Sequence, residues 1–394
     1  GFTLWILIIY RGVKPWLSKK NFWSVPAWLL WGSGVMVLFL FFGILMGPDD
    51  NFAISDYWRW MVVHMWVEVT FEVFTTVIVA YLLVQMGLVT RLMAERIIFL
   101  AVMLFLVTAV NGISHNFYWI AKPTGIIAVG SVFSTLQVLP LLLLTLDAWQ
   151  MRQEGGRANN FVVQGKQVVV MEGVWLFILA VNFWNIFGAG VFGSLITLPL
   201  VNYYEHATYM TGNHAHAAMF GVKGNIALAG LLFCCQHLFK KEAWSEKLVR
   251  TSFWSLNIGI GLMMFLDLFP VGLYQIWLVV TEGLWYARST EVIKVPVFVT
   301  LTYLRTIGGA VFVFGGLLPL IYFVVSRGLR LRSEVDVESN EWADYQKEYG
   351  KEYGYTVVGD VLHDVNKIQD FAPYVAKIKD AGPTSVVTGN WGND

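Results

Sequence analysis

Long apolar runs separated by short polar stretches make up most of the chain. Runs of about 20 apolar residues are long enough to cross a bilayer as α-helices. The pattern predicts eight full membrane spans, at residues 24–46, 58–87, 93–114, 125–149, 167–195, 205–237, 252–282 and 296–326. A further apolar stretch at 1–10 is typical of the end of an earlier span. We therefore predict an all-α, polytopic membrane protein.

The chain starts with Gly1, inside an apolar segment and with no charged stretch before it. A signal peptide would have both a charged beginning and a small-residue cleavage site. We expect the chain to be a fragment that lacks the first spans of a longer protein.

The connections between the spans alternate in charge. Those rich in Lys and Arg read "RGVKPWLSKK", "TRLMAER", "MRQEGGR", "KKEAWSEKLVR" and "RGLRLR", and the others, such as "GPDDNFAISD", are not basic. Basic connections are usually cytoplasmic. We expect a transmembrane domain at residues 1–326 and a polar cytoplasmic tail at 327–394, in a bacterial cytoplasmic membrane.

Composition narrows the class of protein. The chain is 57% hydrophobic and 14% charged, with a net charge of zero, and the charged fraction is about half that of a soluble domain. This balance predicts a lipid bilayer as the surroundings and no nucleic-acid partner. Cys234 and Cys235 are adjacent, so they form neither an ordinary disulfide with each other nor a site for a c-type haem.

Four histidines fall at a similar depth, in the half of the membrane away from the basic connections: His64, His115, His214 and His216. Histidines from three spans at one level favour a metal or haem site over four unrelated hydrogen bonds. His214 and His216 are two residues apart, which turns their side chains about 200° from each other on a helix. We expect each to serve a different cofactor.

Two carboxylates follow His64 along the same span. Glu68 lies one helical turn after His64 and Glu72 a further turn on. A carboxylate beside imidazole favours non-haem iron over copper. Unpaired carboxylates inside a bilayer are costly, which argues against a purely structural role.

These motifs resemble the large catalytic subunit of the respiratory nitric oxide reductases, a branch of the haem–copper oxidase superfamily. The resemblance covers residues 20–326 and is carried by "HMWVEVTFE" (64–72), "HAH" (214–216), "LFPVGLYQIW" (268–277) and "EGLWYARS" (282–289). It implies a haem–copper oxidase-type helical bundle. The eight spans and the partial one would be the last nine of twelve.

The resemblance also implies a set of cofactors and roles. His214 would bind a high-spin haem of the b3 type, and His216 a low-spin haem b whose other ligand lies on an absent span. His64, His115 and Glu68 would hold a non-haem iron, with Glu72 as a catalytic carboxylate. Arg288 would pair with a haem propionate or anchor the chain at the interface. Lys223 would pair with a propionate or a glutamate, or extend towards the membrane surface.

Two residues depart from the reductase pattern. Asn116 stands where the reductases have a second consecutive histidine, and Gln137 stands where they have a glutamate before leucine and proline. Asn116 would offer the iron an amide oxygen, and Gln137 neither gives nor takes a proton near neutral pH. The two changes resemble the nitric oxide dismutases, relatives of the quinol-dependent reductases. We therefore predict an oxidoreductase that dismutates nitric oxide to N2 and O2, with reduction to N2O as the alternative.

Other interpretations stay open at this point. A copper-dependent oxygen reductase is disfavoured, because the resemblance places Glu68 where those enzymes have a tyrosine. A transporter that uses buried His and Glu, or a haem-binding subunit without catalysis, remains a remote alternative. The sequence does not settle whether a quinol is the electron donor or whether the protein is a homo-oligomer.

Overall fold

A computed structural model describes residues 1–111, 123–158, 162–163, 166–167, 171–239, 243–334, 376–377 and 379–380. For residues 67–70, 110–111, 154–158, 162–163, 166–167 and 330–334 it describes the backbone alone. The chain divides into two units, Gly1–Ile321 and Tyr322–Asp394. The boundary predicted after residue 326 stays a prediction.

Eight helical segments in the described residues are long and apolar enough to cross a membrane: Val25–Leu45, Phe52–Gln85, Arg91–Ala109, Thr124–Gln153, Glu172–Thr197, Tyr209–Leu238, Glu246–Thr281 and Pro296–Leu329. The predicted count of eight is therefore confirmed. The stretch predicted as the end of an earlier span is helix α1, Phe2–Val13, which packs against α2.

The spans are built from α-helices joined by tighter or wider helical turns. In chain order they contain α2 (Val25–Phe41) and η2 (Phe42–Leu45); α3 (Phe52–Val62), η3 (Val63–Thr70) and α4 (Phe71–Gln85); α5 (Arg91–Asn111); α6 (Thr124–Leu136) and α7 (Val138–Ala158); α8 (Glu172–Trp184), η5 (Asn185–Phe192) and α9 (Gly193–Thr197); α11 (Tyr209–His216), η6 (Ala217–Gly224) and α12 (Asn225–Leu238); α13 (Glu246–Met263), η8 (Met264–Leu268) and α14 (Phe269–Thr281); α15 (Pro296–Ala310), η11 (Val311–Leu317) and α16 (Leu318–Glu334).

The connections are short. They include η1 (Lys14–Trp16), the helix α10 (Pro199–Glu205), η9 (Tyr286–Arg288) and η10 (Val292–Lys294). A hairpin of β1 (Val162–Val163) and β2 (Lys166–Gln167) pairs antiparallel between α7 and α8. These two-residue strands are a small addition to the predicted all-α fold.

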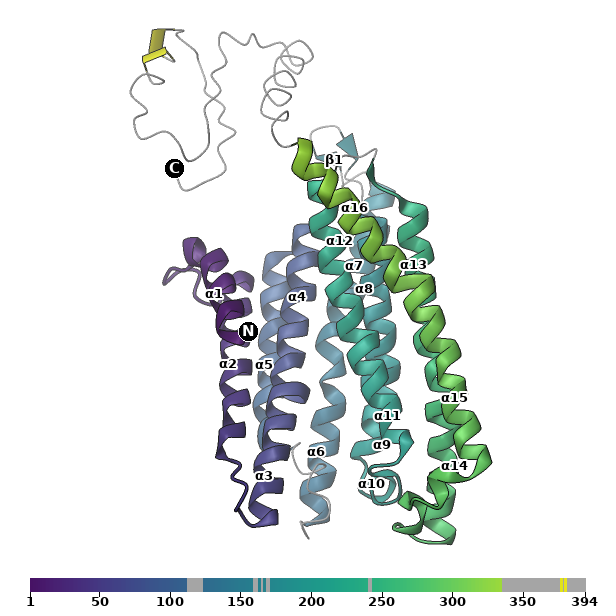
Figure 1. The fold of residues 1–394 in the computed structure, drawn as a ribbon. Coiled ribbons are helices and arrows are strands. Elements are labelled where there is room, and N and C mark those ends of the chain that lie inside the picture. Colours follow the sequence, from purple (N-terminus) through teal and green to yellow (C-terminus); the bar gives the residue numbers. More distant parts are fainter. Residues whose placement is uncertain are drawn as a thin grey trace. The chain divides into compact units, whose positions relative to one another are not determined.

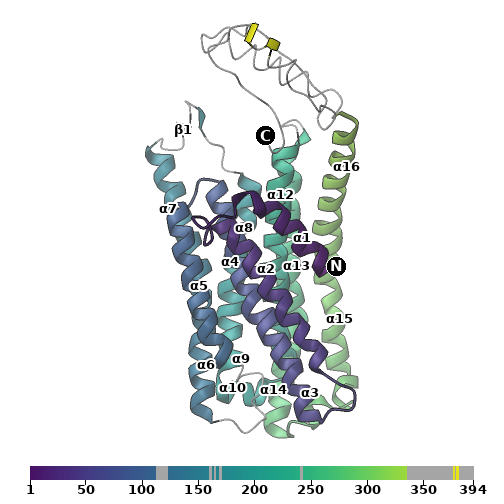
Figure 2. The same cartoon turned by 90° about the vertical axis from the view of Figure 1, so that its left-hand side faces the viewer.

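The helices of the first unit run side by side (Figures 1 and 2). The connections that follow α4, α7 and α12 lie at one end of this bundle, and those that precede α3 and follow α10 and α14 lie at the other. We call the first end the basic end, because "RGVKPWLSKK", "TRLMAER" and the described parts of "MRQEGGR" and "KKEAWSEKLVR" lie there. The alternation of charge predicted from the sequence is thus also an alternation in space.

Several span boundaries differ from the prediction. Asn51 and Ser245 accept backbone N–H bonds as N-caps, so two spans begin at Phe52 and Glu246, before residues 58 and 252. The span predicted at 205–237 is interrupted after α10, where Ala207 has a φ of 59°. Thr208 then caps α11, whose first residue is Tyr209.

A second interruption separates α6 from α7 at Gln137. Pro140 lies three residues later and has no N–H to donate to the carbonyl of Leu136, which opens the helix at this point. Gln137 therefore sits at a break in a span rather than within regular helix.

Candidate functional site

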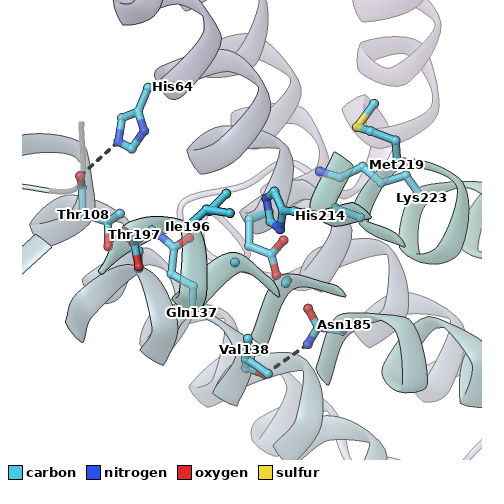
Figure 3. Close-up of a pocket in the computed structure, with 15 residues that line it drawn as sticks. His64, Thr108, Gln137, Val138, Asn185, Ile196, Thr197, His214, Met219 and Lys223 are labelled. Atoms are coloured by element: carbon cyan, nitrogen blue, oxygen red, sulfur yellow. Dashed lines mark hydrogen bonds between the residues drawn. The ribbon is translucent and has the colours of Figure 1, made fainter. Parts of the chain in front are cut away.

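A cavity of about 100 Å³ lies among the helices of the first unit. The side chains with acid–base or ligand chemistry that line it are His64, Glu72, Gln137, His214 and Lys223, and Figure 3 shows the surroundings. They come from three separate spans, with Gln137 at the break in one of them. The structure thus brings together residues that lie up to 159 positions apart in the chain.

Three of the wide helical turns meet at this cavity. The π-helical stretch η3 contributes His64, η5 contributes Asn185 and Ala189, and η6 contributes Met219 and Lys223. A π turn fits one extra residue into the helix and often occurs at functional sites. Here it turns several side chains into the same space.

His64 is fixed by a neighbouring span. Its side chain is 1% exposed, and Nε2 lies 3.2 Å from the carbonyl oxygen of Thr108 on α5. A carbonyl only accepts, so Nε2 carries the proton and Nδ1 is the nitrogen with a lone pair.

His214 is fixed in the same manner by η5. Its Nδ1 lies 3.0 Å from the carbonyl oxygen of Gly188, which makes Nε2 the nitrogen with a lone pair. A side chain at Gly193 would place a Cβ 3.1 Å from Cε1 of His214. The glycine therefore leaves room for the imidazole.

His216 has different neighbours from His214. Its Nδ1 lies 3.0 Å from the carbonyl oxygen of Gly212 on its own helix, and its ring packs against Phe220 with centroids 5.5 Å apart. The ion pair between the buried Asp267 and the half-buried Arg305 also acts on His216 electrostatically. Asp267 accepts a hydrogen bond from Nε of Arg305.

Metal-ligating histidines almost always donate their other ring N–H to a carbonyl or carboxylate. His64 and His214 both do so across a helix interface, and this pattern fits ligand histidines. The bond that His216 makes within its own helix is less specific, because the exposed His237 makes the same kind of bond to the carbonyl oxygen of Phe233. The donor types and tautomers at the cavity therefore fit iron and haem ligation.

The remaining polar groups of the cavity are Glu72, Gln137 and Lys223. Glu72 is half-buried as a residue, but its Oε1 is fully buried and has no hydrogen-bond partner among the described residues. Gln137 is brought in by the break between α6 and α7. Lys223 points to the cavity, with its Nζ 3.7 Å from the centroid of the Phe71 ring.

A second group of polar residues lies near the end of the bundle opposite to the basic end. Glu205 is 1% exposed and accepts a hydrogen bond from Thr211 at 3.3 Å, and burial raises the pKa of Glu205 to about 7. Arg288 donates to the carbonyl oxygen of His206. Burial lowers the pKa of Arg288, and its Nε has no partner among the described residues.

The sequence matches the family description "Cytochrome C and Quinol oxidase polypeptide I" over residues 1–311. The chain belongs to this oxidase family. It is 28% identical over 308 residues to a nitric oxide reductase subunit of Stutzerimonas stutzeri, covering 75% of the chain and 60% of that protein. The fold is similar to that of a haem–copper terminal oxidase dimer known from cryo-EM, with a TM-score of 0.55 and 15% identity over 83% of the chain and 62% of its counterpart.

A separate similarity concerns a short stretch. Sixty residues, 15% of the chain, are 57% identical to "Leu/Ile/Val-binding protein homolog 4" of Brucella abortus and cover 13% of that protein. This protein name belongs to a different class from the oxidases. The chain thus contains two unrelated similarities of very different length.

Family membership confirms the resemblance to the haem–copper oxidase superfamily seen in the sequence, and it confirms the predicted helical bundle. Three of the predicted iron ligands of this oxidase-family chain lie outside the described residues: His115, Asn116 and the side chain of Glu68. Within the part of the chain that is described, no three His, Cys, Asp or Glu side chains lie together as a metal site. The roles of the ligand residues stay predictions.

Sequence reasoning missed three features of the oxidase-family site. It left a pair with a propionate, a pair with a glutamate and an extension to the membrane surface open for Lys223, and it did not place Lys223 at the cavity that it lines. It overlooked Glu205, although the only charged residue of "PLVNYYE" is this glutamate. It also could not identify the acceptors of the histidines, because backbone carbonyls leave no mark in a sequence.

Proposed function

We propose that the protein converts nitric oxide at this cavity and that the reaction is dismutation of two NO molecules to N2 and O2. The observation that carries the proposal is that His64 and His214 enter one cavity in which Gln137, not a carboxylic acid, stands beside them. The similarity to a nitric oxide reductase subunit supports NO as the substrate.

The proposal includes three cofactors. His214 would hold the high-spin haem of the b3 type, His216 the low-spin haem b, and His64 with His115, Glu68 and Asn116 the non-haem iron. When bound, the two irons at the cavity would supply the redox chemistry. Arg288, whose Nε is buried and without a partner among the described residues, suits a haem propionate.

The side chains of the cavity favour a reaction without net proton uptake. Reduction of two NO molecules to N2O and water consumes two electrons and two protons, whereas dismutation consumes neither. Gln137 cannot pass a proton to the cavity. Glu72 is the one carboxyl group among the described cavity residues, and it is held deep inside the bundle.

Reduction to N2O is the second candidate, because the relative with the long match is part of a nitric oxide reductase. Its electron donor would be a quinol or another protein. The surroundings would be a bacterial cytoplasmic membrane, and the dimeric state of the similar terminal oxidase supports a homo-oligomer. The chain spans about 60% of the reductase polypeptide that it matches.

Consumption of NO without an electron donor tests the proposal. Purified full-length protein with both haems is given NO under anoxia while an electrode follows its concentration. Dismutation predicts many turnovers in the absence of quinol or any other reductant. Consumption that starts only after a donor is added would assign reduction, and a preparation without a haem Soret band would exclude both reactions.

The 60 residues similar to a Leu/Ile/Val-binding protein homolog belong, we infer, to the polar tail. The family match ends at residue 311, and the composition changes from apolar to charged after Arg332. We propose that this tail takes no part in the chemistry of the cavity.

A further inference from the structure

A group of hydrogen-bonded side chains joins three spans beside the two π turns η5 and η6. It consists of Trp184, the last residue of α8, Asn225, the first residue of α12, and Asn257 in α13. Trp184 and Asn225 are 3% and 2% exposed, and Asn257 is half-buried. Trp184 precedes η5 and Asn225 follows η6, so the group lies on the basic-end side of both turns (Figure 1). We call these three residues the Asn–Trp network.

Every N–H group of the two asparagine side chains has an acceptor. Nδ2 of Asn257 donates to Oδ1 of Asn225 at 3.2 Å and to the carbonyl oxygen of Phe253 at 2.8 Å. Nδ2 of Asn225 donates to Oδ1 of Asn257 at 3.1 Å and to the carbonyl oxygen of Gly221 at 2.6 Å. Oδ1 of Asn257 also accepts a hydrogen bond from Nε1 of Trp184 at 2.7 Å. A buried polar network with all its donors satisfied is rigid.

The network closes one end of the interface between η5 and η6. A Cβ at Gly221 would overlap the ring of Trp184, so η6 lies directly against the residue that precedes η5. A second contact follows four residues away on each element, where a Cβ at Gly188 would overlap Ala217. Glycines at such contacts let two helices approach closely. Because the two contacts are only about 6 Å apart along the helices, a displacement at one of them also moves the other.

The second contact determines the surroundings of His214. The carbonyl oxygen of Gly188, on η5, accepts the hydrogen bond from Nδ1 of His214 at 3.0 Å. His214 lies three residues before Ala217, the first residue of η6. The donor and the acceptor of this bond are therefore fixed to different spans. Its length depends on how closely η5 and η6 are held together.

We propose that the Asn–Trp network positions His214: it ties α13 to the ends of η5 and η6 and thereby holds the Gly188 carbonyl oxygen within hydrogen-bond distance of the imidazole. Asn257 and Trp184 act on His214 without touching it. A firm hydrogen bond from Nδ1 raises the basicity of the imidazole as a ligand. The inference rests on the proposed role of His214 as the ligand of the high-spin haem, and it is independent of which reaction of NO takes place.

Resonance Raman spectroscopy of the reduced full-length protein with its haems tests the network. The iron–histidine stretching frequency of a high-spin haem rises with the strength of the hydrogen bond from Nδ1, because this bond makes the imidazole more basic. Trp184→Phe keeps a ring beside Gly221 and removes the indole N–H, whereas Asn257→Leu removes the amide. Both variants should show a lower frequency than the native protein, since the Gly188 carbonyl moves away from His214.

Two variants outside the network control this test. Asn182→Leu removes another buried asparagine of α8, which donates to Thr145 on α7, and Trp254→Phe changes an exposed indole of α13. Both should keep the native frequency, even where Asn182→Leu lowers the midpoint temperature of unfolding. Loss of the band in His214→Gly assigns it to this histidine.

Three outcomes would overturn the proposal. An unchanged frequency in Trp184→Phe would do so, and this comparison holds even if Asn257→Leu does not fold. A shift of equal size in Asn182→Leu would do so too, because the loss of any buried amide would then be enough. A band that persists in His214→Gly would overturn the proposed haem ligand and this inference with it, whereas the first two outcomes leave the proposed function intact.

Discussion

At the scale of single residues, the cavity depends on side chains whose partners are backbone carbonyls on other helices. His64 is fixed by Thr108 and His214 by Gly188, both through their carbonyl oxygens. The sequence could suggest the histidines, because charged or polar groups at one depth of a membrane are rare. It could not suggest which ring nitrogen is protonated, since this depends on helix packing.

Under the proposed function, the choice between the two reactions depends on Asn116 and Gln137. Restoring a basic ligand and a carboxyl group, as Asn116→His with Gln137→Glu, should shift the products from N2 and O2 towards N2O. The reason is that Gln137→Glu supplies a group able to hold a proton beside the cavity. The measurement is the N2O to N2 ratio in the gas phase above native, single-variant and double-variant proteins.

One result for the double variant would contradict this prediction. If the ratio is unchanged while haem content is native, these two positions do not decide the reaction. The single variants serve as controls, because each restores only one of the two groups.

Glu205 should make the stability of the fold depend on pH. Its pKa is raised from 4.5 to about 7 by burial, so the folded protein prefers the neutral acid. The contribution to stability is fully present below pH 4.5 and is lost as the pH rises through about 7. A shift of this size corresponds to about 3 kcal/mol.

Thermal unfolding in detergent at several pH values measures this effect. The midpoint temperature of unfolding of the native protein should decrease as the pH rises from about 5 to 8. The midpoint of Glu205→Gln should decrease by less, because the amide does not ionise. Parallel curves for the two proteins would show that Glu205 does not titrate as its burial suggests.

At the scale of elements, the apolar pattern predicted the number of spans well and their internal shape poorly. The breaks at Ala207 and at Gln137 both have local causes, a left-handed residue before the cap Thr208 and a proline at 140. Pro140 is visible in the sequence and could have indicated the second break. The π turns η3, η5 and η6 could not be seen, because one extra residue per turn hardly alters a run that is apolar on all sides.

The contact between η5 and η6 should be sensitive to the size of one side chain. A Cβ at Gly188 would lie 2.3 Å from the Cβ of Ala217, so Gly188→Ala forces the two elements apart. We expect a loss of about 1–3 kcal/mol in stability. If His214 holds the high-spin haem as proposed, we also expect weaker retention of this haem, since the Gly188 carbonyl orients His214. Thermal unfolding and the Soret spectrum measure the two effects.

Gly190→Ala is a matched control on the same π turn. Its added Cβ would meet its nearest neighbours, Asn185 and Val138, at an ordinary 3.6 Å. Equal effects of the two substitutions would mean that the π turn, and not the close approach at Gly188, limits the size of the side chain.

At the scale of the whole molecule, the described residues that line the cavity and the family match lie in one part of the chain. The described residues that line the cavity all precede residue 224, and the family match ends at residue 311. The fold class could be predicted from the sequence because membrane helices must satisfy their own backbone hydrogen bonds. The similarity to a Leu/Ile/Val-binding protein homolog could not, because neither composition nor periodicity indicates it.

Removal of the polar tail should leave the membrane unit intact. A chain that ends at residue 334 is expected to keep its haem spectrum and its rate of NO consumption, because the cavity contains no described residue beyond Lys223. Absorption spectra per mole of protein, compared with the full-length chain, measure this. A loss of haem on truncation would show that the tail supports the membrane unit.

The most direct test of the central claim is the fate of ¹⁵N-labelled NO. Purified full-length protein is supplied with the labelled gas under anoxia, without a reductant, and mass spectrometry follows the gas phase. Dismutation predicts doubly labelled N2 and O2 in equal amounts. Labelled N2O without N2 or O2 would contradict the account and assign the protein to the reductases.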